Sequence, residues 1–358
     1  MDSVTQFVLG AGVGMAVLGP KIGARRAALA GGVLGTLPDL DVFWPFEDSV
    51  SAFVLHRSAT HSLVMHALVT PILGEALRRI AQPLRAERVR AYAAVFLCLT
   101  THALLDALTV YGTRLLWPLW PDPVGLGSIF IIDPLYTLPL LVVTLWALGT
   151  RAWNARLARA LAIALVVSTA YLGWAALAQA IARERAEIAL AAAGIVPDRL
   201  IATATPFNTL FWRVIAVEGE RYFNVYIPII ADPSMISLYA HPRGPASGCL
   251  AGNGAAATLA AFAQGFYRIE SDGRTLAHAD LRMGLTPGYV FRFIVAEHRD
   301  GRFVPVAPQR VGSERQAPGD LAWLWAGIAG RRTLRPAEAA AAVDFAALPP
   351  RLSSAAVC

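Results

Sequence analysis

Long apolar segments fill the first half of the chain, whereas shorter stretches of alternating character fill the second half. Four of the apolar segments have about the 20 residues that a helix needs to cross a bilayer. They are residues 62–80, 91–110, 128–148 and 157–179. A shorter apolar run at 4–19 contains Gly10, Gly12 and Gly14, which would let a neighbouring helix approach closely. The first half is therefore predicted to contain four or five membrane-spanning helices.

A further apolar segment, residues 27–37, is too short to cross a bilayer alone. It ends at Pro38, which breaks a helix, and Asp39 and Asp41 follow directly. We expect a half-span or interfacial helix that ends in an acidic loop.

From about residue 200 the pattern changes to short runs of β-branched and aromatic residues separated by turn sequences. The runs 212–217 and 221–227 flank the turn Glu-Gly-Glu at 218–220, which is typical of a β-hairpin. A later run at 288–295 is followed by another turn sequence at 298–302. Helices are predicted at 183–194, 254–263 and 318–329.

These patterns predict a membrane protein of two domains and a tail. Residues 1–182 form an α-helical transmembrane domain with four to five spans plus a partial helix, and residues 183–331 form a small soluble α+β domain. Residues 332–358, rich in alanine and proline, are expected to be a flexible tail. The composition agrees, because 56% hydrophobic and only 16% charged residues is too apolar for an ordinary soluble protein of this size.

The net charge of +6 comes almost wholly from arginine, since Lys21 is the only lysine. In the first half the basic residues gather in three places between apolar segments. They are Lys21, Arg25 and Arg26; Arg78, Arg79, Arg85, Arg88 and Arg90; and Arg151, Arg156 and Arg159. The positive-inside rule makes these segments cytoplasmic, so the histidine-bearing loops and the C-terminal domain fall on the extracytoplasmic side. This distribution argues against a nucleic-acid partner.

Four of the seven histidines and three aspartates gather in the apolar first half. They are His56, His61, His66 and His102, with Asp39, Asp41 and Asp106. Imidazole and carboxylate are the usual ligands of zinc and similar ions, and ionisable groups at membrane depth are costly enough to indicate a function. His102 and Asp106 stand four residues apart, so one helix face carries both and they can bind one ion. A buried His–Asp pair that holds helices together is the alternative.

Two loop motifs could complete such a site. Asp39 and Asp41 stand two residues apart, and a turn that caps the next element is the alternative to metal binding. The stretch from His56 and Arg57 to His61 joins imidazoles, which suit a divalent metal, to a guanidinium, which suits a phosphate or carboxylate. A polar interfacial cap with chance histidines would have the same composition.

The other polar residues are weaker candidates. His66 lies five residues beyond His61 and would be rotated away from it on a helix. Asp133, a lone carboxylate in an apolar stretch, is expected to cap a helix that begins at Pro134 or to bind a cation, a metal or a hydrogen-bond donor. The remaining histidines are expected on the surface of the soluble domain; they are His241, His278 and His298.

Together these motifs resemble the bacterial and archaeal membrane-bound metal-dependent hydrolases, also described as LexA-binding, inner-membrane-associated hydrolases of the YdjM type. The matching pieces cover most of residues 1–140 in order and spacing. They are Met1 to Gln6, Gly35 to Asp41, His56-Arg57, Thr60-His61-Ser62, His102 to Asp106, Tyr111 to Pro118, and Ile131 to Pro139. The segment from Pro206 to Trp212 is similar to the start of the family's C-terminal domain.

The resemblance implies a hydrolase of the inner membrane with a bound divalent metal, most simply zinc. The ligands would be Asp39, Asp41, His61, His102 and Asp106. A more remote similarity to zinc phospholipase C and single-strand nuclease folds implies phosphoester substrates. One departure stands at Met15, because the family's first helix usually carries a glutamate in this stretch.

The mechanism we expect is attack of a metal-activated water on an ester or phosphoester. His56 or a spare carboxylate would serve as general base, and Arg57 would neutralise a phosphate oxygen. A site at the outer boundary of the lipid bilayer favours a lipid or lipid-linked substrate.

Two other functions fit parts of the pattern. One is a non-enzymatic membrane scaffold with a structural metal site, whose soluble domain binds a protein partner. The other is a transporter with intramembrane His and Asp relays, which is less favoured because the polar groups cluster near one side and the sequence shows no repeated halves.

Overall fold

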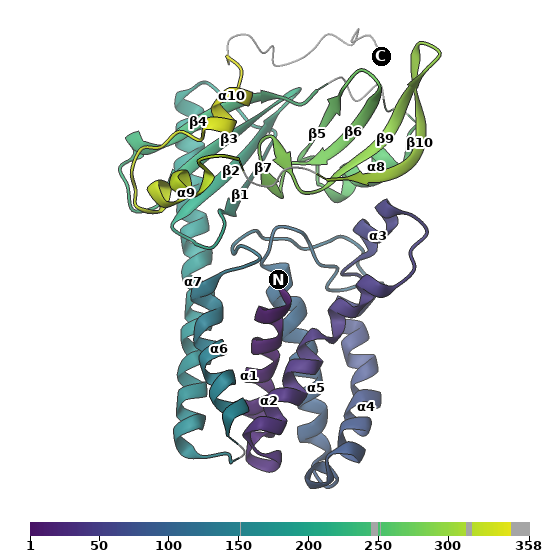
Figure 1. Cartoon of the computed structure of the whole chain (residues 1–358), viewed down its shortest axis with the longest axis vertical. Helices are drawn as coiled ribbons and strands as arrows, with labels where there is room; N and C mark the ends of the chain where they lie inside the picture. The colour runs from purple at the N-terminus through teal and green to yellow at the C-terminus, as the bar shows by residue number, and fades with distance from the viewer. Residues whose placement is uncertain (151, 245–249, 251, 313–316, 345–358) are drawn as a thin grey trace. The chain divides into compact units, whose positions relative to one another are not determined.

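The structure is a computed structural model that describes residues 1–150, 152–244, 250, 252–312 and 317–344. The chain divides into two compact units, and Figure 1 shows that helices build one and sheets build most of the other. The helical unit comprises residues 1–44, 56–176 and 206–208. The sheet unit comprises residues 45–55, 177–205 and the chain from 209 onward.

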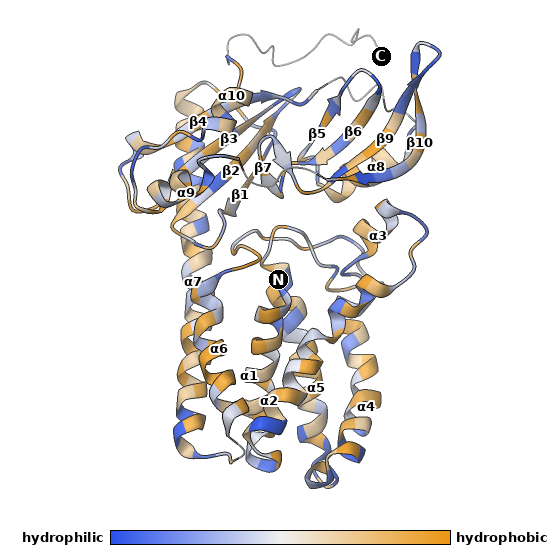
Figure 2. Cartoon of the chain, in the orientation of Figure 1, coloured by the Kyte–Doolittle hydropathy of each residue, from blue (hydrophilic) through white to orange (hydrophobic). Residues whose placement is uncertain are grey.

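Apolar helices form the helical unit, as the hydropathy colouring in Figure 2 shows. They are α1 (Ser3–Ile22), α2 (Ala24–Thr36), α4 (Leu63–Ile80), α5 (Arg88–Ala107), α6 (Pro134–Gly149) and the first part of α7 (Ala155–Ala192), with 3-10 turns η1 (Leu37–Phe43), η2 (Ala59–His61) and η3 (Gln82–Leu84). Among the described residues, α1, α5 and α7 are long and apolar enough to cross a membrane, and α6 is a shorter apolar helix. The unit is thus membrane-spanning in character, and the number of four to five spans stays a prediction.

Helices α1 and α2 pack with their backbones in close contact. Gly10 and Gly14 of α1 face Gly31 and Gly35 of α2, and a Cβ at any of these four positions would collide with the opposing backbone. The predicted close approach is confirmed for Gly10 and Gly14, whereas Gly12 lies against leucine side chains of α6 and α7. This contact holds the last turn of α2 firmly in place.

Helix α6 begins where its capping residue predicts. Asp133 accepts hydrogen bonds from the backbone N–H groups of Leu135 and Tyr136. The hydroxyl of Tyr171 on α7 donates to the other carboxylate oxygen at 2.8 Å. The prediction that Asp133 caps a helix starting at Pro134 is confirmed, and the hydroxyl partner explains how the carboxylate is tolerated among apolar helices.

Basic segments of the helical unit meet at one end. Lys21 at the end of α1 pairs with Glu87 just before α5. Arg90 donates to a backbone carbonyl near the end of α1 at 2.7 Å, and Arg25 of α2 donates to one near the end of α6 at 2.7 Å. The opposite end of α1 carries Gln6, next to the histidine-bearing segments. The charge asymmetry that the sequence indicated is therefore a property of the folded unit.

Within the described part of the sheet unit, the strands form two four-stranded antiparallel sheets and one short two-stranded sheet. The first sheet has the order β1 (Arg199–Ala204), β2 (Phe211–Glu218), β3 (Arg221–Pro228), β4 (Ser237–Pro242). The second has the order β10 (Arg302–Val311), β9 (Arg292–Arg299), β6 (Thr275–Asp280), β5 (Tyr267–Ser271), and the short sheet pairs β7 (Gly284–Leu285) with β8 (Gly288–Tyr289). The remaining elements are α3 (Ser49–Leu55), η4 (Pro233–Met235), α8 (Gly254–Phe262), α9 (Asp320–Ile328) and α10 (Pro336–Ala341).

Most of the elements predicted for this unit are present. The β2–β3 hairpin is confirmed, with Glu218 opposite Arg221, and Gly219 has the positive φ that such a turn requires. Helices α8 and α9 confirm the helices predicted at 254–263 and 318–329. The helix predicted at 183–194 is not separate, because it forms the last part of α7. The predicted strand at 288–295 is broken, because β8 ends at Tyr289 and β9 begins only at Arg292.

Segment 45–55 joins the sheet unit although the chain on either side belongs to the helical unit. Phe53 of α3 packs against Phe262, Phe291 and Phe293, with ring centroids 4.8, 4.4 and 5.2 Å away. Aromatic packing in the sheet unit therefore anchors the chain between the acidic turn η1 and His56.

Part of the expected flexible tail forms a helix, whereas residues 345–358 of that tail lie outside the described residues. Residues 336–341 form α10, and Glu338 is buried with His241 Nε2 at 2.8 Å from its carboxylate. The prediction of surface histidines is wrong for His241 and His278, which are both buried, whereas His298 is exposed. Glu338, which bonds to His241, lies 97 positions further along the chain. The sequence around His241 therefore gives no sign that this histidine is buried.

Candidate metal centre

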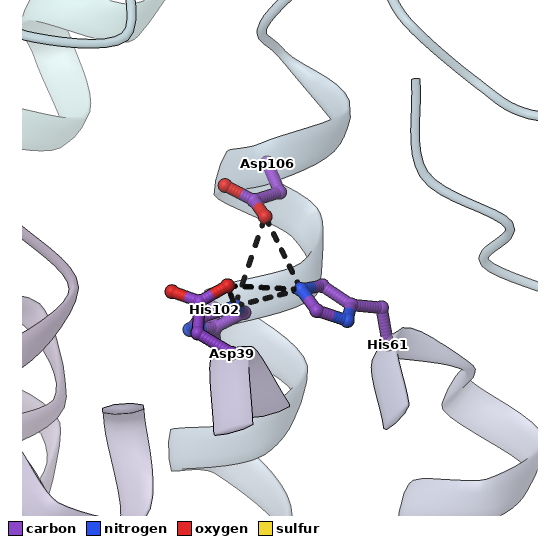
Figure 3. Close-up of side chains that lie close together, drawn as sticks. All are labelled: Asp39, His61, His102 and Asp106. Carbon is purple, nitrogen blue, oxygen red and sulfur yellow. Dashed lines mark hydrogen bonds and ion pairs between the residues drawn. The ribbon is translucent and has the colours of Figure 1, made fainter. Parts of the chain in front are cut away.

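Four side chains from separate parts of the helical unit converge on one point, as Figure 3 shows. Asp39 lies in η1, His61 ends η2, and His102 and Asp106 lie one turn apart on α5. One ligand atom from each residue lies within 4.8 Å of all the others. His61, His102 and Asp106 are buried, and the Asp39 side chain is 24% exposed.

Local sequence places these residues at the ends of helices. Pro38 follows α2 directly and starts the tight turn η1, which carries Asp39. Ser62 caps α4 by accepting from the N–H of Met65, so His61 stands just before the helix rather than on it. This arrangement brings two short turns to the buried face of α5.

The two imidazoles meet through their Nε2 atoms, which are 3.0 Å apart. His61 Nε2 lies 3.4 Å from Asp39 Oδ1 and 3.3 Å from Asp106 Oδ2. His102 Nε2 lies 3.5 Å and 3.7 Å from the same two oxygens. A tetrahedral site with metal–ligand bonds of about 2.1 Å has edges of about 3.4 Å. The five separations therefore match the ligand shell of a small divalent ion.

Hydrogen bonds at the other ring nitrogens orient both imidazoles. His102 Nδ1 donates to the carbonyl oxygen of Gly35 at 2.6 Å. His61 Nδ1 lies 3.0 Å from the hydroxyl of Thr60, which itself donates to Asp41 Oδ2 at 2.9 Å and so accepts from the ring. Both Nδ1 atoms therefore carry the hydrogen, and both Nε2 lone pairs point toward the shared centre.

The converging atoms need a positive charge between them. Two nitrogen lone pairs at 3.0 Å repel each other unless a proton or a cation separates them. Asp106 Oδ2 is buried and accepts no hydrogen bond from the described residues, although Arg57 pairs with it at 3.0 Å. Two imidazoles and two carboxylates form a donor set that suits a divalent ion. The residues present therefore fit a bound metal.

Further donors surround the second oxygen of Asp106. Gln6 Nε2 donates to Asp106 Oδ1 at 3.0 Å, and the amine of Met1 bonds to the same atom. Arg57, which is almost fully buried, also donates to Thr109 Oγ1 at 3.3 Å and stacks over the ring of Tyr111. The structure thus places Arg57 against Asp106, and its action on a phosphate stays a prediction.

Asp41 lies beside the four-residue centre rather than in it. Its carboxylate accepts from His56 Nδ1 at 2.8 Å, from the backbone N–H of Arg57 at 3.1 Å and from Thr60 at 2.9 Å. His61 Nδ1 is 3.9 Å away from it. Asp41 therefore organises the loop that carries His56 and His61, and direct metal binding by Asp41 stays a prediction.

The acidic turn and His61 share strong electrostatic coupling. Burial disfavours the charged forms of Asp39 and Asp41, but the adjacent imidazoles outweigh it and lower both pKa values: those of His102 and His61 act on Asp39, and that of His56 acts on Asp41. Burial alone would lower the pKa of His61, but Asp106 and Asp39 outweigh it and raise that pKa. The cluster therefore favours ionised carboxylates around a positive centre.

Sequence reasoning missed groups that the folded chain supplies. The carbonyl of Gly35 carries no side-chain signal, and the sequence presents Thr60 only as part of the Thr60-His61-Ser62 motif. Gln6 offered a signal, because a polar amide inside an apolar segment has to find a partner when buried. His66 lies outside the donor set, with Nε2 donating to the carbonyl of Thr60 at 2.8 Å. Met15 lies nine residues beyond Gln6 on α1, roughly 13 Å along the helix axis.

Comparisons with known proteins agree with the helical unit. A profile of the family described as YdjM inner membrane protein matches residues 1–199, which include the whole candidate centre. The chain is also similar to the inner membrane protein YbcI of Escherichia coli (strain K12), at 37% identity over 105 residues. That match spans 29% of this chain and 58% of the relative. No solved structure matches the chain.

Proposed function

Because the chain belongs to the YdjM inner membrane protein family, we propose that it is a membrane-embedded hydrolase that depends on a divalent metal, most simply zinc. Its substrate would be an ester or phosphoester. One observation carries the proposal: two imidazole nitrogens and two carboxylate oxygens converge at a buried point, each imidazole oriented by a bond at its other nitrogen.

The ion would be held by the four residues of the centre. They are Asp39, His61, His102 and Asp106. A divalent ion bound there would lower the pKa of a coordinated water and polarise the scissile group. Zinc is favoured over a harder ion because half of the donors are imidazole nitrogens and the separations suit tetrahedral coordination.

His56 is placed to accept a proton during hydrolysis. Asp41 holds the Nδ1 side of its ring at 2.8 Å, which leaves Nε2 as the basic nitrogen. Its ring centroid lies 5.9 Å from that of His61, so it stands next to the centre without belonging to the donor set. The His56 side chain is also 26% exposed, so water can reach its ring. The buried imidazoles of His61 and His102 lack this access.

Arg57 would stabilise negative charge on the substrate. Its guanidinium pairs with Asp106 at 3.0 Å and is held by Tyr111 and Thr109, so a positive charge stands at the edge of the centre. A phosphoester oxygen that approaches the centre would meet this charge, which supports a phosphoester over a neutral ester.

We place the centre at the extracytoplasmic boundary of the inner membrane. The basic residues gather at the other end of the helical unit, which the positive-inside rule assigns to the cytoplasm. Exposed apolar residues follow Asp41 and occupy the loop after α5, as expected at a membrane interface. They include Phe43, Trp44, Leu119 and Trp120. The orientation can be tested by fusing, after α7, a reporter that works only in the cytoplasm. Activity of this reporter would contradict the orientation.

Metal content and hydrolysis together test the function. We expect purified protein to hold about one zinc ion per chain by mass spectrometry, and to hydrolyse members of an ester and phosphoester panel. His102→Ala should lose both, whereas His298→Ala, which removes an exposed histidine of the sheet unit, should lose neither. Hydrolysis that persists in folded, metal-free His102→Ala protein would overturn the proposal. Stoichiometric metal without any hydrolysis would favour a scaffold with a structural metal.

A further inference from the structure

An apolar pocket adjoins the metal centre inside the helical unit. Its volume is about 320 Å³, near the lower end of the range for ligand pockets. The residues that line it come from η1, η2, α4 and α5, and include Pro38, Thr60, Met65, Val69, Leu73 and Leu99. Almost all of these side chains are apolar, so the pocket suits a hydrocarbon rather than a polar ligand.

One end of the pocket is lined by residues that neighbour the metal ligands in the chain. Pro38 and Thr60 line it, and each immediately precedes a ligand residue, Asp39 and His61. The pocket then follows α4 from Met65 to Leu73, which is about 12 Å along a helix axis. A bound chain would therefore point its head at the metal centre.

The other end of the pocket reaches the lipid-facing surface. Ile72 lines the pocket and is 70% exposed, and Leu68, one turn earlier on α4, is also exposed. Helix α4 packs along α5, a candidate membrane span, so this surface faces acyl chains when the protein is in a bilayer. A lipid chain can enter sideways without leaving the membrane.

One polar side chain in the pocket has an unused hydrogen-bonding atom. His66 is 2% exposed and lines the pocket, and its Nε2 donates to the Thr60 carbonyl. Its Nδ1 has no partner among the described residues and is left as an acceptor. A hydroxyl near the head of a lipid would satisfy this buried nitrogen.

We propose that this pocket binds one hydrocarbon chain of a membrane lipid whose ester or phosphoester group lies at the metal centre. The substrate class is therefore a membrane lipid rather than a soluble ester. The reaction rests on the proposed hydrolase function, whereas the binding of the chain does not. The two can be tested separately.

Photolabelling of the full-length protein in nanodiscs tests the binding. The probe is a phosphatidylglycerol with a diazirine in one acyl chain. Leu99 is the diagnostic site, because it lines the pocket and is only 3% exposed, so a probe on the outer surface labels it poorly. We expect labelling of Leu99 in the wild type and in the metal-ligand variant His102→Ala, and about tenfold less in Val69→Trp, since the indole excludes about two methylene groups.

Two further variants control for folding. Val142→Trp adds the same indole at a position of α6 that is 62% exposed, and should leave the labelling of Leu99 unchanged. Leu73→Ala enlarges the far end of the pocket, and should shift labelling toward probes with longer chains. Both measurements remain informative if Val69→Trp fails to fold.

The outcomes separate the two proposals. Absence of label at Leu99, or label that Val69→Trp and Leu73→Ala do not change, overturns the lipid pocket even if a short soluble ester is hydrolysed. Label at Leu99 without hydrolysis of any substrate overturns the hydrolase function and leaves the pocket in place.

Discussion

The two units each bury a cluster of histidine and carboxylate groups, but only one of these clusters is complete. In the sheet unit, Glu338 accepts from His241 at 2.8 Å, from Asn224 at 2.5 Å and from Tyr226 at 2.9 Å. Arg335 lies 3.5 Å from the same carboxylate. Every oxygen of Glu338 therefore has a partner within the protein.

The cluster of the helical unit lacks such partners at its centre. His61 and His102 turn lone pairs toward each other, and Asp106 Oδ2 accepts no hydrogen bond from the described residues. Its outer atoms, in contrast, are bonded to Gly35, Thr60 and Gln6. This difference is what we expect if the cluster of the sheet unit stabilises the fold and the cluster of the helical unit holds ligands for an ion.

Removing a ligand should have the largest effect, and only on the incomplete cluster. We expect Asp106→Asn to lower bound metal to background and hydrolysis by about 10³-fold, equal to about 4 kcal/mol of transition-state stabilisation. Stability should also fall, because the amide leaves the buried charges of Arg57 and of the Met1 amine without their carboxylate, so metal content and activity are compared on folded protein. Mass spectrometry, an activity assay and thermal unfolding measure the three quantities. If Asp106→Asn kept the wild-type metal content, the cluster of the helical unit would not differ from that of the sheet unit in the way described above.

Removing the carboxylate of the complete cluster should instead destabilise the protein. Glu338→Ala leaves buried donors of His241, Asn224 and Tyr226 unpaired, and we expect a loss of about 3–5 kcal/mol in the free energy of unfolding. Chemical denaturation followed by tryptophan fluorescence measures it, and metal content should stay normal. Glu297→Ala is the matched control: this side chain on β9 is 39% exposed and pairs only with the exposed Arg299 among the described ion pairs, so the substitution should cost less than about 0.5 kcal/mol.

Acid should destabilise the sheet unit through its second buried histidine, His278. Burial holds the pKa of His278 at about 4, Arg243 and Arg282 act in the same direction, and Asp280 opposes them. Between the ordinary value of 6.5 and about 4, the unfolded chain binds a proton that the folded chain does not, so stability falls as pH falls. The loss amounts to about 3 kcal/mol across the interval.

Denaturation of the full chain at pH 7 and pH about 4.5 measures this dependence. His278→Phe keeps an aromatic ring stacked on Tyr267 and should remove most of the difference between the two conditions. An unchanged pH dependence in this variant would assign the effect to other groups.

Loosening an outer bond of the centre should have the smallest effect. Thr60→Val removes the hydroxyl that links His61 to Asp41, and we expect metal affinity to fall about tenfold while the ligands remain. Competition with a chelator measures the affinity. Thr144→Val, a substitution of the same shape on α6, should leave affinity unchanged, and an equal loss there would point to a general packing effect.

Much of the architecture could be predicted because apolar length and turn chemistry act locally. The β2–β3 hairpin follows from Gly219, and the start of α6 follows from Asp133 and Pro134. In contrast, α10 and the burial of His241 depend on a pairing between β4 and a segment 97 residues later, which no local pattern reveals.

The residues of the centre could be named from the sequence, but their separate roles could not. Helical spacing places His102 and Asp106 together, and the structure brings Asp39 and His61 to them. Asp41 has the same side chain as Asp39 and stands two positions away, yet it faces the loop of His56 instead. The backbone path of the 3-10 turn η1 determines which of the two aspartates faces the centre, and this path could not be predicted from the sequence.

The hydrogen bond from His102 to the Gly35 carbonyl bears on how the protein is made. Gly35 reaches α5 only when α2 lies against α1 through their glycines, so the imidazole is oriented only after three helices have inserted and packed. A chain still leaving the translocation machinery would carry the ligands but not the site. Metal uptake would then be a late event in biogenesis, and the amount of bound metal would report how much of the protein has finished assembling in the membrane.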